Sequence, residues 1–339
     1  MSRKVTIYDI AKYLRISAAT VSYVLNDVPK VSEQTKKTVL KAAKELGYSR
    51  DYKAVAFSTG KTRTIFLYFP NDDISQSFLQ NPFYSEFLGY FQKEVQEEDY
   101  DVVIKTMTRD KIMSKIKSRG VCCLVYIGKF PEENYLELKN SDIPVVLVDV
   151  FEEYSKYFTN VRTDDELGTY LAVKYLIDNG HRNIGFLSGD INNSIVDKRR
   201  FEGYKKAFEE FHIPLDENNL YYVDATFDNG YQISSSIMNN KNMTGLVCAA
   251  DTLAIGVIKG YLHAGKKLPD DLSIVGFDDI QIDQLTSPTL TTIRQDIPRK
   301  AKEAAKIALQ AIKNKQNLKI EFLNEPILVE RESVKNLLN

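Results

Sequence analysis

The sequence predicts an all-α headpiece of three short helices followed by an α/β body of two lobes, each built on a doubly wound parallel sheet. Length is the first reason, because 339 residues are too many for one ordinary core. The apolar pattern is the second: its spacing is helical at the start, whereas from Ile65 onward apolar strands alternate with amphipathic helices. We therefore divide the chain into a headpiece over 1–48, a linker over 49–63 and a two-lobed body over 64–339.

Three helix starts are predicted in the headpiece. Thr6 begins the first helix, with Asp9 placed to complete a capping box, and Ser17 and Ser32 cap the second and third. Gly47 marks the end of the third helix. Helix, tight turn and helix is the geometry in which the second helix enters the DNA major groove. The apolar residues at helical spacing are predicted to face one core: Ile7, Ile10, Ala11, Leu14, Val21, Val24, Leu25, Val39, Leu40, Ala43 and Leu46.

Charge is distributed unevenly along the chain. Residues 1–64 hold thirteen basic and five acidic residues, a net charge of +8, whereas the rest of the chain carries −9. A basic head on an acidic body indicates a polyanionic partner for the head, although charge alone also fits a solvated basic face. Small side chains that allow close approach to base edges are predicted to face outward from the second helix, beside Tyr23: Ser17, Ala18, Ala19, Thr20 and Ser22.

The headpiece resembles a known family. Residues 6–11 (TIYDIA), 16–26 (ISAATVSYVLN) and 31–48 are similar to the head signature of the lactose-repressor (LacI/GalR) family of transcriptional regulators. The resemblance implies operator contacts by Thr6, Tyr8, Ser17, Ala18, Ala19, Thr20, Ser22, Tyr23 and Asn26. In that family the residues at Ala18 and Ala19 select the operator, and arginine is usual where this chain has Tyr23. Because tyrosine cannot form arginine's bidentate bond to guanine, we expect a different preferred base there.

The linker admits two interpretations. Residues 49–58 are too few for a helix that is stable alone, and residues 59–62 (TGKT) interrupt any helical pattern, so a flexible tether is the simpler one. The resemblance implies a hinge helix that folds in the minor groove, with Asp51 as its cap and with Ala54 and Phe57 on the DNA. Phe57 then takes the place of the apolar wedge between base steps.

The body is predicted to contain strands over 65–69, 101–105, 121–127, 145–148, 184–188, 246–249, 273–277 and 326–330, with helices over 82–96, 166–178, 196–211 and 252–263. Family-like phrases recur in it, including residues 81–84, 180–186, 200–204, 275–279 and 290–293, so the resemblance covers essentially the whole chain. It implies a body similar to periplasmic sugar-binding proteins. Ligands of open α/β sheets bind beyond the carboxyl ends of the strands, which places a cleft between the lobes.

The resemblance implies Arg200, Asp278 and Asp149 as the principal effector-binding residues by motif match, and a guanidinium and two carboxylates suit a polyol. For Asp278 the alternative is a turn that caps the next segment, and for Arg200 it is a surface charge. The chain has no tryptophan, so stacking on a ligand falls to Tyr or Phe, with Phe83 and Phe227 as candidates. Ala250 stands where the family has asparagine, which puts one sugar hydrogen bond in doubt.

The resemblance implies a homodimeric repressor of a sugar-utilisation operon, bound to a pseudopalindromic operator and released by a small sugar. A long segment over 71–80, a short arm over 106–121 and residues 127–130 (IGKF) resemble repressors that answer to galactose or galactosides. A global carbon-control regulator whose body docks a phosphorylated carrier protein is the alternative within the family.

Other classes fit less well. No run of eighteen apolar residues and no apolar signal region is present, so we expect a cytoplasmic protein without a membrane segment. His181, His212 and His263 are scattered, and Cys122, Cys123 and Cys248 lie in apolar runs, so we expect buried thiols, no metal site and no cofactor. No catalytic constellation stands out, which argues against an enzyme. A transport receptor would need a signal peptide and no basic head.

Overall fold

The computed structural model describes residues 5–25, 29–48, 63–69, 81–106, 116, 120–151 and 153–338. The chain divides into two compact units, Met1–Thr62 and Arg63–Asn339. Asn26, the linker with Ala54 and Phe57, the segment 71–80 and most of the arm 106–121 lie outside the described residues.

Three helices form the headpiece: α1 (Ile7–Leu14), α2 (Ala18–Leu25) and α3 (Glu33–Glu45). Polar side chains begin each of them. The Asp9 carboxylate accepts from both the amide (2.8 Å) and the hydroxyl (2.7 Å) of Thr6. Ser17 Oγ accepts from the Thr20 amide, and Ser32 Oγ accepts from the Thr35 amide. Gly47, at a φ of +66°, follows the end of α3.

The headpiece core contains Ile10, Ala11, Val21, Val24, Val39, Ala42 and Ala43. The prediction that Leu40 faces this core is wrong, because 46% of Leu40 is exposed. The inward face of α3 runs through positions 39, 42, 43 and 46, which are three or four residues apart. Leu40 lies about 100° around the helix from Val39, and Ala42 takes the inward place.

The first lobe of the body is a six-stranded parallel sheet in the order β11-β5-β4-β3-β1-β2. Its strands alternate apolar side chains between two faces. Ile65, Leu67 and Phe69 pack with α6 and α13 on one face, whereas Phe66 and Tyr68 pack toward α8 on the other. The bounds are β1 Thr64–Phe69, α6 Pro82–Glu97, β2 Asp101–Thr106, β3 Cys123–Ile127, α8 Glu132–Leu138, β4 Val145–Val148, β5 Thr159–Thr163, α13 Ile297–Asn314 and β11 Glu321–Asn324.

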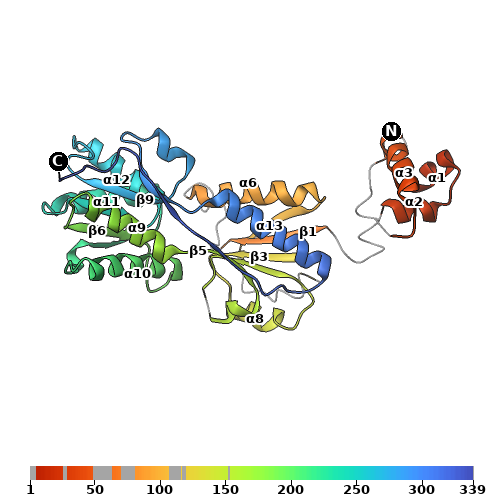
Figure 1. The fold of residues 1–339 in the computed structure, drawn as a ribbon, viewed down its shortest axis with the longest axis horizontal. Coiled ribbons are helices and arrows are strands. Elements are labelled where there is room, and N and C mark those ends of the chain that lie inside the picture. Colours follow the sequence, from red (N-terminus) through yellow and green to blue (C-terminus); the bar gives the residue numbers. More distant parts are fainter. Residues whose placement is uncertain are drawn as a thin grey trace. The chain divides into compact units, whose positions relative to one another are not determined.

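The second lobe is a sheet in the order β12-β10-β9-β8-β6-β7, parallel except for the antiparallel pair β10 and β12. Helices α9 and α10 cover one face, and α11 and α12 cover the other (Figure 1). The bounds are α9 Asp165–Asp178, β6 Ile184–Ser188, α10 Ile195–Glu210, β7 Leu220–Tyr222, α11 Phe227–Asn239, β8 Gly245–Cys248, α12 Asp251–His263, β9 Ser273–Asp278, β10 Thr291–Arg294 and β12 Ile327–Val329.

The chain passes between the lobes three times, from β5 to α9, from β10 to α13 and from β11 to β12 (Figure 1). These crossovers bond to one another. The Asp164 amide donates to the Asn324 carbonyl (3.1 Å), and the Asn324 side-chain amide donates to the Gln295 carbonyl. The three segments therefore form one joined region beneath the space between the lobes.

Within the described residues no helix is both long and apolar enough to cross a membrane. No group of His, Cys, Asp and Glu side chains there is arranged to hold a metal ion. All three cysteines are free thiols; Cys123 and Cys248 are buried and Cys122 is half-buried.

Candidate functional site

The first turn of helix α2 exposes small and polar side chains to solvent. Ser17, Ala19 and Tyr23 are exposed, while Ala18 and Thr20 are half-buried. Ala18 also packs against the headpiece core, so its methyl group is shared between the core and the surface. The Ser17 and Thr20 hydroxyls bond each other at 2.8 Å, which fixes the first turn of the helix.

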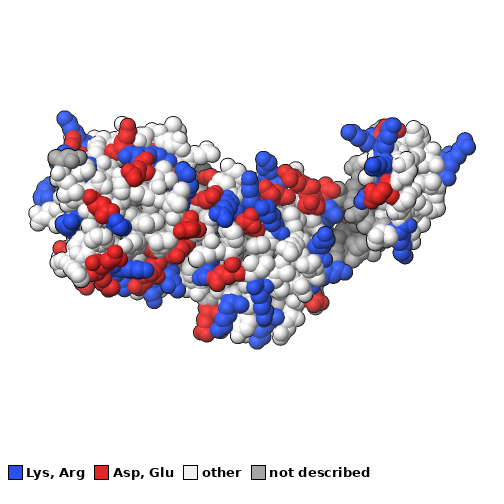
Figure 2. Space-filling model, viewed as in Figure 1, with Lys and Arg blue, Asp and Glu red and all other residues white. Residues whose placement is uncertain are grey.

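The exposed positions Thr6 and Tyr8 belong to the start of α1, and Ser22 is half-buried on α2. The Lys30 ammonium lies 5.5 Å from the centre of the Tyr23 ring, whose residue is 38% exposed. Figure 2 shows further basic side chains on the visible face of the headpiece, in keeping with its excess of Lys and Arg. The contact adds a cation beside the aromatic ring at the position where we expect base contact.

A cavity of about 360 Å³ lies between the two lobes of the body. It opens at the carboxyl ends of β4 and β9, where Asp149 follows one strand and Asp278 ends the other. Arg200 enters it from α10. The structure thus brings the three predicted effector-binding residues together. Its wall is completed by Asn81, Phe83, Tyr84, Ile127, Gly128, Lys129, Asn193, Ser194, Ile195, Val196, Asp197, Ala225, Ala249, Ala250 and Gln295.

Arg200 is held rigidly in this cavity. Its Nε donates to Asp165 Oδ1 at 2.8 Å, and its Nη1 donates to the Ala249 carbonyl. The guanidinium lies 3.7 Å from the centre of the Phe277 ring. Burial alone would lower the pKa of Arg200, but Asp165 and Asp278 outweigh it and raise the pKa. Arg200 is therefore a buried, fully charged donor and not a surface charge of α10.

Asp149 is paired with Lys300, which was not among the predicted effector-binding residues. Lys300, in the first turn of α13, donates to Asp149 Oδ2 at 2.6 Å, and the Thr163 amide donates to Asp149 Oδ1 at 3.1 Å. Lys300 is fully buried, which is costly for an ammonium group unless it is paired. The sequence signal for it is weak, because its neighbours on the buried face of α13 at helical spacing, Ile297, Ala304 and Ala308, are mostly alanines.

Asp278 contacts Gln295, which was also not among the predicted effector-binding residues. The Gln295 side-chain amide donates to Asp278 Oδ1 at 2.5 Å, and Arg200 Nη2 lies 3.8 Å from the same oxygen. Burial is the main cause that raises the pKa of Asp278 to about 8, while Arg200 acts in the opposite direction. Burial therefore favours the protonated form of this carboxyl group. Its neighbour Asp279 is instead ion-paired with Arg294 and Arg331.

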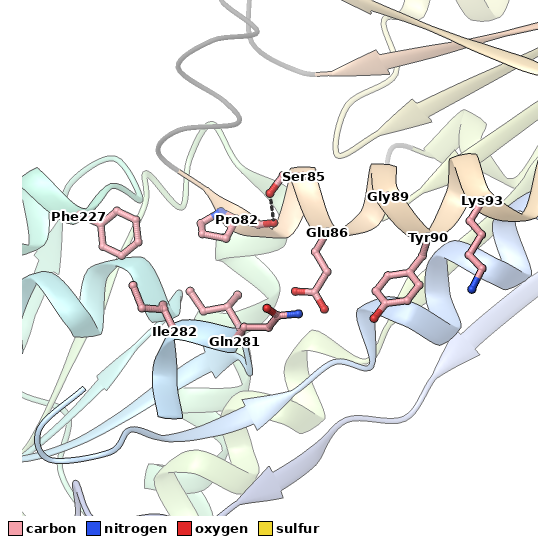
Figure 3. Close-up of a pocket in the computed structure, with 10 residues that line it drawn as sticks. Pro82, Ser85, Glu86, Gly89, Tyr90, Lys93, Phe227, Gln281 and Ile282 are labelled. Atoms are coloured by element: carbon pink, nitrogen blue, oxygen red, sulfur yellow. Dashed lines mark hydrogen bonds between the residues drawn. The ribbon is translucent and has the colours of Figure 1, made fainter. Parts of the chain in front are cut away.

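The two aromatic residues predicted to stack on a ligand, Phe83 and Phe227, lie in different places. Phe83 lines the cavity, and the adjacent Tyr84 also lines it. Phe227, at the start of α11, is not among the residues that line it, because it faces a groove on the outside of the body between α6 and residues 280–282 (Figure 3). Ala225 stands in the cavity wall instead. Ala250 also lines it and contributes no hydrogen-bonding side chain.

Both units of the chain match known protein families. Residues 6–51 match the family model of bacterial regulatory proteins of the lacI family, and residues 173–334 match that of the periplasmic binding protein-like domain. The HTH-type transcriptional repressor PurR of Vibrio parahaemolyticus is 33% identical over 98% of this chain and 99% of its own. Catabolite control protein A of Priestia megaterium is 32% identical over 86% of this chain and 87% of its own.

Two solved structures share the fold. The lac repressor dimer bound to operator and the anti-inducer ONPF matches 98% of this chain and all of its own, at 22% identity and a TM-score of 0.77. A LacI family transcriptional regulator from Enterococcus faecium with bound ribose matches 81% of this chain and 99% of its own, at 27% identity and a TM-score of 0.72. The predicted fold class is confirmed: a helix-turn-helix head and a periplasmic-binding-protein-like body of two parallel-sheet lobes. The chain belongs to the lacI family of bacterial regulatory proteins, and it is a DNA-binding transcriptional regulator, not an enzyme.

Proposed function

We propose that this protein is a cytoplasmic repressor that binds a pseudopalindromic operator as a homodimer and releases it when a small neutral sugar fills the cleft of the body. The observation that carries the proposal is the convergence of Asp149, Arg200 and Asp278 on one cavity of about 360 Å³. Its volume falls within the range of small-molecule sites.

The chemistry of the cavity supports a polyol. Each hydroxyl of a sugar both donates and accepts, and the wall offers carboxyl, guanidinium and amide groups to both roles. The charges of Asp149 and Arg200 are balanced inside the protein, since Asp149 pairs with Lys300 and Arg200 pairs with Asp165, and the wall also holds one further residue of each sign, Lys129 and Asp197. An added ionic ligand would upset that balance, whereas a neutral ligand leaves it intact. The Enterococcus faecium regulator holds ribose.

The outer groove near Phe227 supports the homodimer. It has a volume of about 570 Å³ and is lined by apolar Pro82, Tyr90, Ile280 and Ile282 together with Glu86, Lys93 and Gln281 (Figure 3). The adjoining Leu285 is 82% exposed. Ile280 is already buried, so a second copy of the chain covers Pro82, Tyr90, Ile282 and Leu285 and sets the two heads for two half-sites. The lac repressor structure is a dimer on its operator.

Ligand binding is tested first by the melting temperature of the protein. The full chain is screened by thermal shift against sugars and nucleobases, and at least one neutral sugar, with D-ribose and D-galactose in the panel, raises its melting temperature. In Asp278→Ala the headpiece still binds DNA, but that sugar no longer shifts the melting of the body, because a wall residue of the cavity is gone. A shift that survives in Asp278→Ala would contradict the placement of the site. A panel in which only nucleobases act would contradict the sugar assignment.

A global carbon-control role is the second candidate, because Catabolite control protein A is 32% identical over 86% of this chain. In that case the body docks a phosphorylated carrier protein. A pull-down from sugar-fed cells with the full chain distinguishes the two functions. A stoichiometric phosphoprotein partner supports the second candidate, and its absence together with a direct thermal shift by a free sugar supports the first.

A further inference from the structure

A chain of side chains connects the lobes beneath the effector cavity. Asp149 belongs to the first lobe and Asp278 to the second, and neither is bonded to the other. Lys300 and Gln295 lie between them. The Lys300 ammonium donates to Asp149 Oδ2 at 2.6 Å and to Gln295 Oε1 at 2.5 Å, and Gln295 Nε2 donates to Asp278 Oδ1 at 2.5 Å. We name these four residues the interlobe bridge.

The chemistry of the bridge fixes its direction. An ammonium group can only donate, so it requires the oxygen of the Gln295 amide, and the amide nitrogen is then directed at the carboxyl group of Asp278. Thr163 Oγ1 donates to the same Gln295 oxygen at 3.3 Å, which ties the crossover from β5 into the arrangement. Gln295 itself belongs to the crossover from β10 to α13. One amide therefore joins a cation of the first lobe, an acid of the second and two of the three crossovers.

Lys300 is the one lysine that is fully buried among the described residues. Burying an ammonium group is unfavourable unless its partners compensate for the lost hydration. A leucine or methionine at this place on α13 would continue the apolar face and avoid that cost. Lys300 does not line the cavity, but it holds two residues that do, Asp149 and Gln295. Its positive charge also favours the ionised forms of Asp278 and Asp165, since it lowers the pKa of both.

We propose that Lys300 is a positioning residue of the effector site: through Gln295 it ties Asp149 of the first lobe to Asp278 of the second, and so couples occupation of the cavity to the angle between the lobes. The inference rests on the proposed effector function of this cavity. A ligand that bonds Asp149 and Asp278 meets two side chains whose orientation the interlobe bridge already fixes. Loss of Lys300 would therefore weaken binding through orientation and not through a lost ligand contact.

Thermodynamic coupling without any ligand tests the bridge directly. The urea midpoint of the full chain is measured at pH 6 for Lys300→Met, Asp278→Asn and the double variant. At that pH Asp278 is mostly protonated, so direct charge attraction between the two sites is small. We expect the midpoint shift of the double variant to differ from the sum of the single shifts, and we expect the shifts to add once Gln295→Leu is present in every protein. Additive shifts with Gln295 in place would overturn the proposal.

A matched control lies on the same helix. Lys306 is exposed and pairs with Glu303 on α13, so Lys306→Met should add to Asp278→Asn in either background. If Lys300→Met alone fails to fold because Asp149 is left unpaired, Lys300→Met/Asp149→Asn removes both charges and replaces it in the cycle. If the midpoint shifts of Lys300→Met/Asp149→Asn and Asp278→Asn do not add, and become additive with Gln295→Leu, the result supports the bridge. If they add with Gln295 in place, the proposal is overturned.

The ligand measurement separates this inference from the proposed function. For D-ribose or D-galactose, whichever shifts the melting of the wild type, Lys300→Met should raise Kd about tenfold or more, the effect of one lost buried hydrogen bond. Lys306→Met should leave Kd unchanged. If neither these nor any other sugar binds the wild type, the sugar assignment fails and the urea cycle still decides the bridge. If a sugar binds and Lys300→Met leaves its Kd unchanged, the bridge has no part in ligand binding and the inference fails.

Discussion

Asp278 shows how single residues of the cavity obtain unusual properties. Burial removes water from its carboxyl group, and Asp251 adds negative charge nearby; together they raise its pKa from 3.8 to about 8 against the influence of Arg200, Gln295 and Lys300. The folded protein therefore holds a proton that the unfolded chain releases above about pH 4. Stability from this proton is full at low pH and is lost as pH rises toward 8.

We predict that the unfolding free energy of the wild type falls between pH 5 and pH 8 more steeply than that of Asp278→Asn, because asparagine has no proton to lose. Asp165, Asp251 and Asp283 also have pKa values raised by burial and add to the slope in both proteins, so the comparison with Asp278→Asn, and not the slope of the wild type itself, reports on Asp278. Urea denaturation at pH 5, 6.5 and 8 measures it. Asp270→Asn, at an exposed ion pair with Lys335, is the control and should follow the wild type. Parallel profiles for wild type and Asp278→Asn would contradict the raised pKa.

Sequence patterns located three charged residues that line the cavity, but not the lining residue Gln295 or Lys300 behind it. Arg200, Asp149 and Asp278 follow buried strands or recur in family-like phrases, so their place in the fold was readable. Lys300 and Gln295 act through contacts between β4, β9 and α13, and which side chains meet there depends on how the crossovers bring the lobes together. Phe227 shows the same limit, because aromatic character alone did not indicate that it lies on the outer groove.

At the scale of elements, the body is held together by helices that pack at very short range. Helices α11 and α12 meet at glycines: an added Cβ at Gly256 would lie 2.3 Å from the Phe227 carbonyl oxygen, and one at Gly230 would lie 2.4 Å from the Leu253 carbonyl oxygen. Both neighbours are backbone atoms, which cannot move aside as a flexible side chain does.

We predict that Gly256→Ala destabilises the body by about 1–3 kcal/mol, because the added methyl group forces α11 and α12 apart. The melting temperature of the full chain measures the loss. Ser236→Ala in α11 is the matched control: Ser236 is exposed, and alanine is a better helix former than serine, so its stability should hold or rise. Equal melting of Gly256→Ala and wild type would show that the two helices are less closely fitted than described.

Helix α2 carries the prediction for DNA. Tyr23 is exposed beside Lys30, so its ring is available to the bases at the position where the family usually has arginine. We predict that Tyr23→Arg changes the preferred base at one symmetric position of each half-site, with gain of guanine, because arginine bonds guanine in a bidentate manner. Selection of operators from a random DNA pool by both proteins measures the change. Tyr13→Arg, exposed on α1 and outside the start of α2, serves as control; identical selected sites for Tyr23→Arg and wild type would exclude base contact by Tyr23.

The alternation of apolar strands and amphipathic helices in the sequence predicts most elements of the body. It does not predict α8, α11, α13 or the short strand β7, although α13 is the helix that supplies Lys300. The buried face of α13 consists largely of alanines, among them Ala301, Ala304, Ala305 and Ala308, which give less apolar contrast than the leucines and valines of a typical core helix. Strands β5, β10 and β11 are not predicted either, because polar side chains such as Thr159, Thr291 and Asn324 are buried in hydrogen bonds there.

At the scale of the whole molecule, the proposed function needs two copies of the chain. The outer groove between α6 and residues 280–282 is the proposed contact, and α6 belongs to one lobe while residues 280–282 belong to the other (Figure 3). A contact that spans both lobes senses the angle between them. Ligand binding can then alter the dimer only if it favours one angle over the other.

We predict that Ile282→Glu yields monomers and weakens operator binding by at least about tenfold, because a carboxylate placed in an apolar contact loses its hydration, which costs several kcal/mol. Sedimentation gives the oligomeric state, and fluorescence anisotropy with labelled operator gives the affinity. Leu136→Glu, at an exposed apolar residue of α8, is the control and should remain dimeric. A dimeric Ile282→Glu would place the subunit contact elsewhere.

The central claim is that the head binds DNA and that the cavity of the body governs this binding. The most direct test is one anisotropy titration of the full chain against its selected operator, with and without the sugar that raises the melting temperature. We expect the sugar to raise the Kd for operator at least about tenfold, the lower range of effector coupling, and to have no effect on Asp278→Ala. A sugar that binds the body of the wild type yet leaves operator affinity unchanged would contradict the account.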